Sequence, residues 1–257
     1  MKTPFPVTYK ELWLPQHLRS TQLPPSAPGG HPMVLFAYMK GTTADGVHFT
    51  GGVTSNIVVA AAAAQNAKQA FYITIRFKLD QTFAAGAAAD QYLFQKLLAA
   101  DNYLRVYLKA ADGKLYWEQG NLAGGIQFTL TSTTVSWTAG AWYIVTASLT
   151  STPTQRLIVN GTVQDTDAAV AVATPNGGDM VIGSSSDGGA DGVVGTISWV
   201  VIGVGTTAAT ALTPTEETEL SKGFPPNLLK VQYLFLLDNG RGVTATDRGS
   251  AGGNGTL

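Results

Sequence analysis

Apolar and polar residues alternate through the middle of this chain, from Val47 onward. In residues 71–79, Phe71, Ile73, Ile75, Phe77 and Leu79 fall on one side, and mostly polar residues lie between them. A period of two is the pattern of a half-buried β-strand. Further strands are predicted at 103–109, 114–118, 127–131, 142–149, 156–159, 180–182 and 194–202. Asp112-Gly113, between two of them, predicts a hairpin.

The spacing of these strands predicts an all-β fold. Short strands separated by Gly, Asn and Asp turns are typical of a sandwich or barrel rather than of βαβ units. One short helix is indicated over 214–222, because Thr213 is a suitable N-cap, Pro214 suits the first helical position and Gly223 can end it. We predict a two-sheet antiparallel jelly-roll sandwich with one short helix and extended terminal arms.

Proline content divides the chain. More than half of its 12 prolines lie in residues 1–32, and proline removes the hydrogen-bond donors that strands and helices need. Residues 1–44 are therefore predicted to be a Pro-rich N-terminal arm, followed by a sandwich domain at 45–229. Residues 230–257 supply an apolar strand and a Gly-rich tail, which we expect to complete the chain's own sheet or that of a neighbour.

Charge is sparse. Charged residues make up 13% of the chain and hydrophobic residues 45%, whereas about 25% of an average soluble domain is charged. Either Ser, Thr, Gly and Ala cover the surface, or neighbouring copies do. The net charge of −1 gives no basic footprint for nucleic acid. There is no cysteine, and no stretch reaches the roughly 18 apolar residues of a membrane-spanning helix, so we expect no membrane insertion.

The order of these segments resembles the concanavalin A-like lectin/glucanase superfamily, in the laminin G-like branch that occurs in bacteriophage virion proteins. The resemblance covers residues 45–222. It includes Trp142 at the start of a strand, Asn160-Gly161 in a tight turn and the predicted helix. The segments that carry it are 47–52, 71–79, 137–143, 156–161, 182–183, 195–198 and 211–216.

No catalytic residues are predicted. Glucanases of this superfamily place two or three carboxylates on alternate positions of one strand. Of the Glu residues here, Glu118 alone lies on a predicted strand, without an acidic neighbour. His17, His31 and His48 are the only histidines, and two of them lie in the arm, so neither a zinc triad nor a Ser-His-Asp relay is assembled. We therefore expect a protein that is not an enzyme.

Two kinds of ligand site are considered. Tyr107, Tyr116, Trp117 and Trp137 are candidates for stacking on sugar rings, whereas Trp142 and Trp199 are expected to pack in the core. The resemblance implies that Asp179, Asp187 and Asp191 could bind Ca²⁺ at one rim of the sandwich. The alternative is that these Asp residues cap their own Gly-rich turns, and no other cofactor is expected.

The resemblance, the sparse charge, the extended arms and the absence of a signal peptide and of cysteine favour a structural component of a bacteriophage particle. Such a protein would be a capsid decoration or a tail fibre protein, with glycan adhesion as an added role. It would be made in the host cytoplasm and reside in the virion. Its expected partners are copies of itself, other virion proteins and surface glycans. The alternative is a free carbohydrate-binding, lectin-like module.

Overall fold

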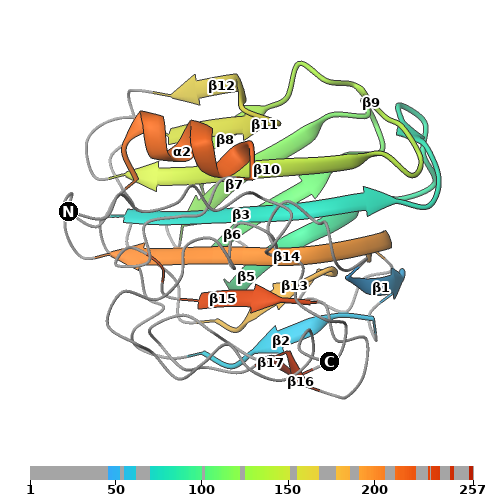
Figure 1. The fold of residues 1–257 in the computed structure, drawn as a ribbon, viewed down its shortest axis with the longest axis horizontal. Helices are drawn as coiled ribbons and strands as arrows, with labels where there is room; N and C mark the ends of the chain where they lie inside the picture. Colours follow the sequence, from blue (N-terminus) through green and yellow to red (C-terminus); the bar gives the residue numbers. More distant parts are fainter. Residues whose placement is uncertain are drawn as a thin grey trace, which may run out of the picture. The chain divides into compact units, whose positions relative to one another are not determined.

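The computed structural model describes thirteen segments of the chain, and the predicted arm at 1–44 lies outside them. In these segments the protein consists of antiparallel strands and one helix (Figure 1), which confirms the all-β prediction. The described residues are 46–52, 55–61, 70–99, 102–121, 125–150, 155–167, 178–185, 191–205, 212–223, 231, 233–237, 244–245 and 255–256.

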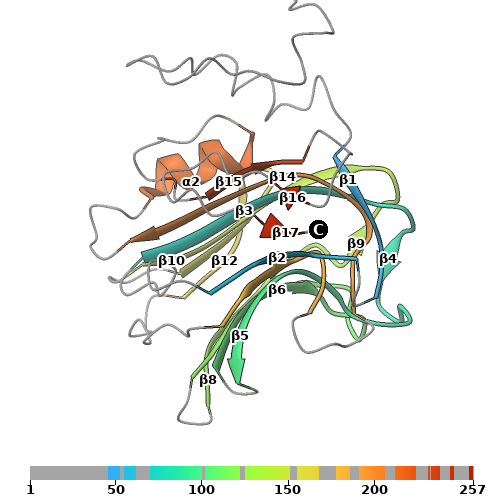
Figure 2. The same ribbon diagram turned by 90° about the horizontal axis from the view of Figure 1, so that it is seen from below.

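The first sheet is built around the two longest strands, β3 and β14. Figure 2 shows that it lies over the second sheet, with the helix α2 on its outer side. Its order is β1 (Val47–Thr50), β14 (Val194–Gly205), β3 (Ala70–Leu79), β10 (Trp142–Thr150), β11 (Gln155–Val159) and β12 (Thr162–Asp167), and β15 (Tyr233–Leu236) also pairs with β14.

The second sheet carries the candidate site described below. Its strands β5, β6 and β8 bend away from the first sheet, so the outer face lies on the inside of the bend (Figure 2). Its order is β16 (Thr244–Ala245), β17 (Gly255–Thr256), β2 (Ile57–Val59), β13 (Met180–Ile182), β5 (Gln91–Ala99), β6 (Asn102–Leu108), β7 (Leu115–Asn121) and β8 (Gly125–Thr131). A short pair, β4 (Phe83–Ala84) and β9 (Ser136–Trp137), stands apart.

The core lies between the two sheets and follows the alternation of the sequence. Phe71, Ile73, Ile75 and Phe77 of β3 are buried in one cluster with Val106 and other apolar residues of the second sheet. The alternate residues of β3 point away from the core, toward the outer face of the sheet. On that face the hydroxyls of Thr74 and Thr146 form a hydrogen bond of 2.9 Å. The period of two therefore divides β3 between the core and the face below α2.

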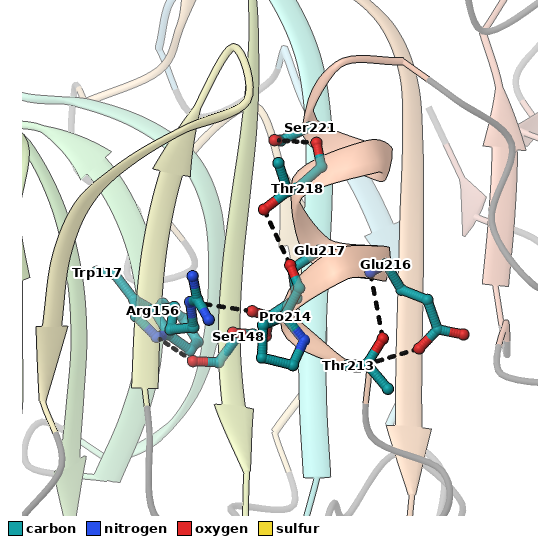
Figure 3. A network of polar contacts seen from close by, with 9 residues as sticks. All are labelled: Trp117, Ser148, Arg156, Thr213, Pro214, Glu216, Glu217, Thr218 and Ser221. Carbon is teal, nitrogen blue, oxygen red and sulfur yellow. Dashed lines mark hydrogen bonds and ion pairs between the residues drawn. The ribbon is translucent and has the colours of Figure 1, made fainter.

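The helix α2 (Pro214–Ser221) is confirmed, and it ends one residue before the predicted position. Its capping box is complete, because the Thr213 hydroxyl accepts from the backbone N–H of Glu216 while the Glu216 carboxylate accepts from the Thr213 N–H (Figure 3). Gly223 follows with φ of 84°, a left-handed conformation that suits glycine at a helix end. Leu220 packs on a second buried cluster with Tyr72, Trp199, Val201, Leu212, Val231 and Leu234.

The hairpin predicted at Asp112-Gly113 joins β6 to β7. Gly113 has φ of 72°, and a Cβ atom there would lie 2.4 Å from the carbonyl oxygen of Val135. Both observations require glycine. The turn fixes the register of the hairpin, in which Tyr107 lies opposite Tyr116 and Arg105 opposite Glu118.

The strand predicted near the end of the chain joins the first sheet. Tyr233–Leu236 pairs with Trp199–Ile202 of β14 in the same chain, and Phe235 is buried in the core. β1 occupies the same edge of β14 further along, opposite residues 194–197. The register of β14 against β3 shifts between Ile197 and Trp199, and the N–H of Leu237 donates to the carbonyl of the intervening Ser198 at 2.9 Å.

The described segments contain no helix that is long and apolar enough to cross a membrane, since α2 has only 8 residues.

Candidate functional site

The candidate site lies on the outer face of the second sheet, across β5, β6 and β7. Tyr92 is opposite Tyr107 and Tyr107 is opposite Tyr116, and we call these three residues the tyrosine row. One pleat away lies the polar row, formed by Gln95, Arg105, Glu118 and Thr129, which are also opposite one another in turn. The residues between the rows, such as Val106 and Trp117, point into the core.

The rings of the tyrosine row stand side by side. The centroids of Tyr92 and Tyr107 are 4.9 Å apart with 12° between the ring planes, and those of Tyr107 and Tyr116 are 5.3 Å apart. Adjacent strands are about 4.8 Å apart, so each ring covers the face of the next. Only 3% of Tyr107 is exposed. Tyr92 is buried as well, at 7%, so Tyr116 is the residue of the row that a ligand can reach, and Tyr92 and Tyr107 hold the surface beneath it.

Arg105 and Glu118 form an ion pair in the polar row. The Nε and the Nη2 atoms of Arg105 lie 2.7 and 2.6 Å from the same carboxylate oxygen of Glu118. The guanidinium also lies 4.2 Å from the ring centroid of Tyr103 and 4.9 Å from that of Tyr107. Its Nη1 donates to the Tyr92 hydroxyl at 3.4 Å. Cation–π contacts and charge-assisted hydrogen bonds thus hold both side chains in place.

Tyr116 is the more accessible end of the tyrosine row. Its hydroxyl donates to Asp112 Oδ2 at 2.6 Å, and Lys109 Nζ lies 4.7 Å from its ring centroid. Burial, together with the hydrogen bond to Asp112, raises the pKa of Tyr116 to about 12. Burial and the Glu118 carboxylate also raise the pKa of Tyr107 well above its ordinary value. Both phenols are therefore neutral hydrogen-bonding groups at neutral pH.

The surroundings of Glu118 do not form a pair of catalytic carboxylates. On this face its neighbours along β7 are Tyr116 and Gly120, and the residues opposite it are Arg105 and Thr129. None of these four carries a carboxyl group. A glycosidase needs two carboxyl groups about 5 to 9.5 Å apart across the bond that is cleaved.

The prediction that Trp117 and Trp137 stack on sugar rings is wrong, because both side chains are 0% exposed. The ring of Trp117 stacks on Phe71, and its Nε1 donates to the Ser148 carbonyl of the opposite sheet at 3.3 Å. The Nε1 of Trp137 donates to the carbonyl of Gly113 at 2.9 Å. Both residues are core side chains with a satisfied donor, so neither ring can stack on a sugar.

The other two tryptophans of the described segments, Trp199 and Trp142, lie in different environments. Trp199 is buried under α2, as expected for a packing residue. Trp142 is not a core residue: it lies opposite Lys78 on the outer face of the first sheet. The Arg76 guanidinium lies 3.7 Å, and Lys78 Nζ 4.9 Å, from its ring centroid. The prediction that Trp142 packs in the core is therefore wrong, because its position at the start of β10 faces away from the second sheet.

Two of the predicted calcium ligands, Asp179 and Asp191, lie beside different positions of β5. Asp179 accepts from the N–H of Ala61 at 2.7 Å and precedes Met180, which lies opposite Lys96. The Asp191 carbonyl instead accepts from Tyr92 N–H at the start of β5. Four strand residues, about 13 Å along the strand, separate these two points of β5. Asp187 lies outside the described residues, and the described residues contain no cluster of three metal-ligating side chains.

Sequence reasoning missed Arg105 and Tyr92 as parts of the site. The hairpin at Asp112-Gly113 could have revealed Arg105, because counting back from the turn sets it opposite Glu118. Tyr92 lies on β5, where the register shifts between Tyr92 and Phe94. That shift leaves Leu93 and Phe94 both buried, so no simple alternation marks the strand.

Comparison with known proteins agrees with this architecture. A family model described as the concanavalin A-like lectin/glucanases superfamily matches residues 50–205. No curated protein matches the chain. Among solved structures, a candidate carbohydrate binding protein from Bacteroides ovatus is similar with a TM-score of 0.54 and 14% identity, over 82% of this chain and 58% of that one.

A second similar structure is the CBM40 of the Ruminococcus gnavus IT-sialidase, bound to α2,3-sialyllactose. It has a TM-score of 0.50 and 16% identity, over 69% of this chain and 96% of that one. The binding domain of Paraclostridial Mosquitocidal Protein 1 also has a TM-score of 0.50, with 14% identity over 67% of this chain and 42% of that one. At these identities the likeness is one of fold. The family model covers more than half of the sequence, and the chain belongs to the concanavalin A-like lectin/glucanases superfamily.

Proposed function

We propose that this chain is a non-catalytic carbohydrate-binding module whose site is the outer face of β5, β6 and β7. The observation that carries the proposal is the tyrosine row beside the Arg105–Glu118 pair. Family membership supports it, as do the two similar structures described as carbohydrate-binding, one of them with a bound sialylated sugar.

The site suits a sugar because it combines fixed geometry with many hydrogen-bonding groups. A phenol hydroxyl both donates and accepts, an arginine donates and a carboxylate accepts, which matches a ligand rich in hydroxyl groups. The rings of Tyr92 and Tyr107 are held by stacking and Arg105 by Glu118. Little side-chain entropy is therefore lost when a ligand binds.

The proposed module is not an enzyme and requires no metal. The lack of a second carboxylate at the four positions around Glu118 supports a binding role over glycoside hydrolysis. The separation of Asp179 from Asp191 supports binding without a calcium ion that these two residues share. Binding is therefore expected to persist in EDTA.

The experiment is a glycan array probed with the full chain, followed by calorimetry on the oligosaccharides that bind. Tyr116→Phe removes one hydroxyl and the donor to Asp112, and should weaken binding about three- to tenfold. The matched control is Tyr143→Phe on the first sheet, where the hydroxyl accepts from the Thr138 N–H; it should leave affinity unchanged. A wild-type chain that binds no glycan contradicts the proposal, and equal effects of the two variants would move the site elsewhere.

A structural role in a bacteriophage particle is a second proposal, and the low charged fraction of 13% favours it. A surface that packs against copies of itself or other virion proteins has less need of charges that keep monomers apart. Mass spectrometry of purified particles would detect the chain in stoichiometric amounts, and sedimentation would show self-association. A monomer at tens of micromolar that is absent from particles would contradict this role.

A further inference from the structure

We infer that the face formed by the tyrosine row and the polar row takes uncharged, hydroxyl-rich glycans and discriminates against glycans that carry a carboxylate or sulfate. This inference rests on the proposed function and names the ligand class of the same site.

The first reason is that the arginine of the site is already engaged. Two of its nitrogens contact one oxygen of Glu118 at 2.7 and 2.6 Å, its third contacts the Tyr92 hydroxyl at 3.4 Å, and two tyrosine rings flank the guanidinium. The Glu118 side chain is 6% exposed. A glycan carboxylate could take Arg105 only by displacing Glu118, which would leave a buried carboxylate without its cation.

The second reason is the balance of charge at the accessible end. Asp112 accepts from the Tyr116 hydroxyl and from the Lys114 N–H, and Asp90 accepts from the Ala110 N–H. Burial opposes ionisation of Asp112, but these hydrogen bonds and the nearby Lys109 and Lys114 outweigh it and lower the pKa of its carboxyl group. Lys109 and Lys114 balance the carboxylates of Asp90 and Asp112 around Tyr116, so the accessible end has no net positive charge that would attract an acidic glycan.

The third reason is that the phenol and hydroxyl groups of this face are neutral. The phenols of Tyr107 and Tyr116 stay protonated, because burial and neighbouring carboxylates raise the pKa of each. Glu118 is also hydrogen-bonded to Tyr107. Thr129 and Thr131 lie beside these residues on β8, and their hydroxyls donate and accept like those of a sugar. These threonine hydroxyls can form hydrogen bonds with the hydroxyls of a glycan that carries no charge.

The test compares pairs of glycans that differ only in an acidic group, such as lactose and α2,3-sialyllactose, for each neutral glycan that the array identifies. Calorimetry on the full chain should give more than about tenfold weaker binding for the acidic member, because its carboxylate would have to compete with Glu118 for Arg105. Equal or tighter binding of the acidic member overturns the inference and leaves the proposed function standing. Absence of binding to every glycan overturns both.

Glu118→Gln provides an independent check, because it keeps the shape of the side chain and leaves the Arg105 charge uncompensated. The variant should narrow or reverse the preference for the neutral member of each pair. The control is Glu219→Gln on α2, where the same change removes a pair with Lys222 on the far side of the other sheet. If Glu118→Gln does not fold, Asp112→Asn at the accessible end should narrow the preference in the same direction. Unchanged preference in a folded variant contradicts the inference.

Discussion

The carboxylate of Glu217 lies 3.2 Å from the Nε of Arg156, and only 2% of its side chain is exposed. Glu217 comes from α2 and Arg156 from β11, so this pair links the helix to the outer face of the first sheet (Figure 3). Ser148 of β10 lies beside Glu217, and its carbonyl accepts from Trp117 of the other sheet. The contact therefore connects α2 to both layers of the sandwich.

The first prediction concerns pH. Burial, partly offset by Ser148 and Arg156, raises the pKa of Glu217 to about 7, whereas an unperturbed Glu has a pKa of about 4.3. A raised pKa means that the folded state holds the proton more tightly. The raised pKa therefore adds to the free energy of unfolding in full below about pH 4, and this contribution of up to about 4 kcal/mol is lost as the pH rises through 7. Urea unfolding across this range should show the decline in wild type and not in Glu217→Gln.

Glu219→Gln serves as the control for that measurement, because Glu219 is an exposed residue of the same helix. It should keep the wild-type dependence on pH. A Glu217→Gln variant with the same slope as wild type would show that Glu217 does not titrate in this window.

The second prediction concerns Arg156. Replacing it with Met keeps most of the apolar stem and removes the cation, so the buried Glu217 carboxylate loses its partner. At pH 8 the variant should lose about 3 kcal/mol of its free energy of unfolding. At pH 5, where Glu217 is protonated in the folded state, the loss should be much smaller. Equal losses at the two pH values would assign the effect to packing instead.

The third prediction concerns the start of α2. Thr213→Ala removes the side-chain acceptor of the capping box, and the free energy of unfolding should fall by about 1 kcal/mol. Thr215→Ala is the matched control, because Thr215 is an exposed residue in the first turn of α2. It should have little effect on the free energy of unfolding. Thermal melts of both variants decide between a cap that stabilises α2 and one that does not.

The fourth prediction concerns β15. Phe235 is fully buried between the sheets, so Phe235→Ala should cost about 3 to 5 kcal/mol. Val135 is exposed and provides a control, because Val135→Ala should stay within about 0.5 kcal/mol of wild type.

Deleting residues 230–257 should lower the free energy of unfolding by several kcal/mol. A truncated chain that melts unchanged but no longer assembles would show that the strand serves a neighbouring copy in solution.

The elements that sequence predicted best are those in which one local rule decides the structure. Alternation placed β3 almost to the residue, because one face of this strand packs in the core and the other does not. The turn chemistry of Asp112-Gly113 and the capping chemistry of Thr213 and Pro214 act over a few residues. They predicted a hairpin and a helix that the structure confirms.

Predictions failed where the position of a side chain depends on which face of a strand meets the opposite sheet, or on how the strands pair. Trp117 and Trp142 have the same side chain, yet one fills the core and the other lies outside under Arg76. Composition cannot separate them, since the choice depends on which face of each strand meets the opposite sheet. Asp179 and Asp191 are near in sequence, but β13 lies between them, so that Met180, next to Asp179, lies opposite Lys96 of β5 while Asp191 contacts Tyr92 at the start of that strand.

The pairing of β14 also sets an order for biosynthesis. β14 takes β3 on one edge and both β1 and β15 on the other, and β2 in the second sheet pairs with β13. On the ribosome, β1, β2 and β3 therefore emerge long before the strands that complete their ladders. Such non-local pairing slows folding and leaves apolar strands waiting without partners. Phe49 and Ile57 reach their final neighbours, Gly195 and Ile182, only after most of the chain has been translated, so this sandwich closes late.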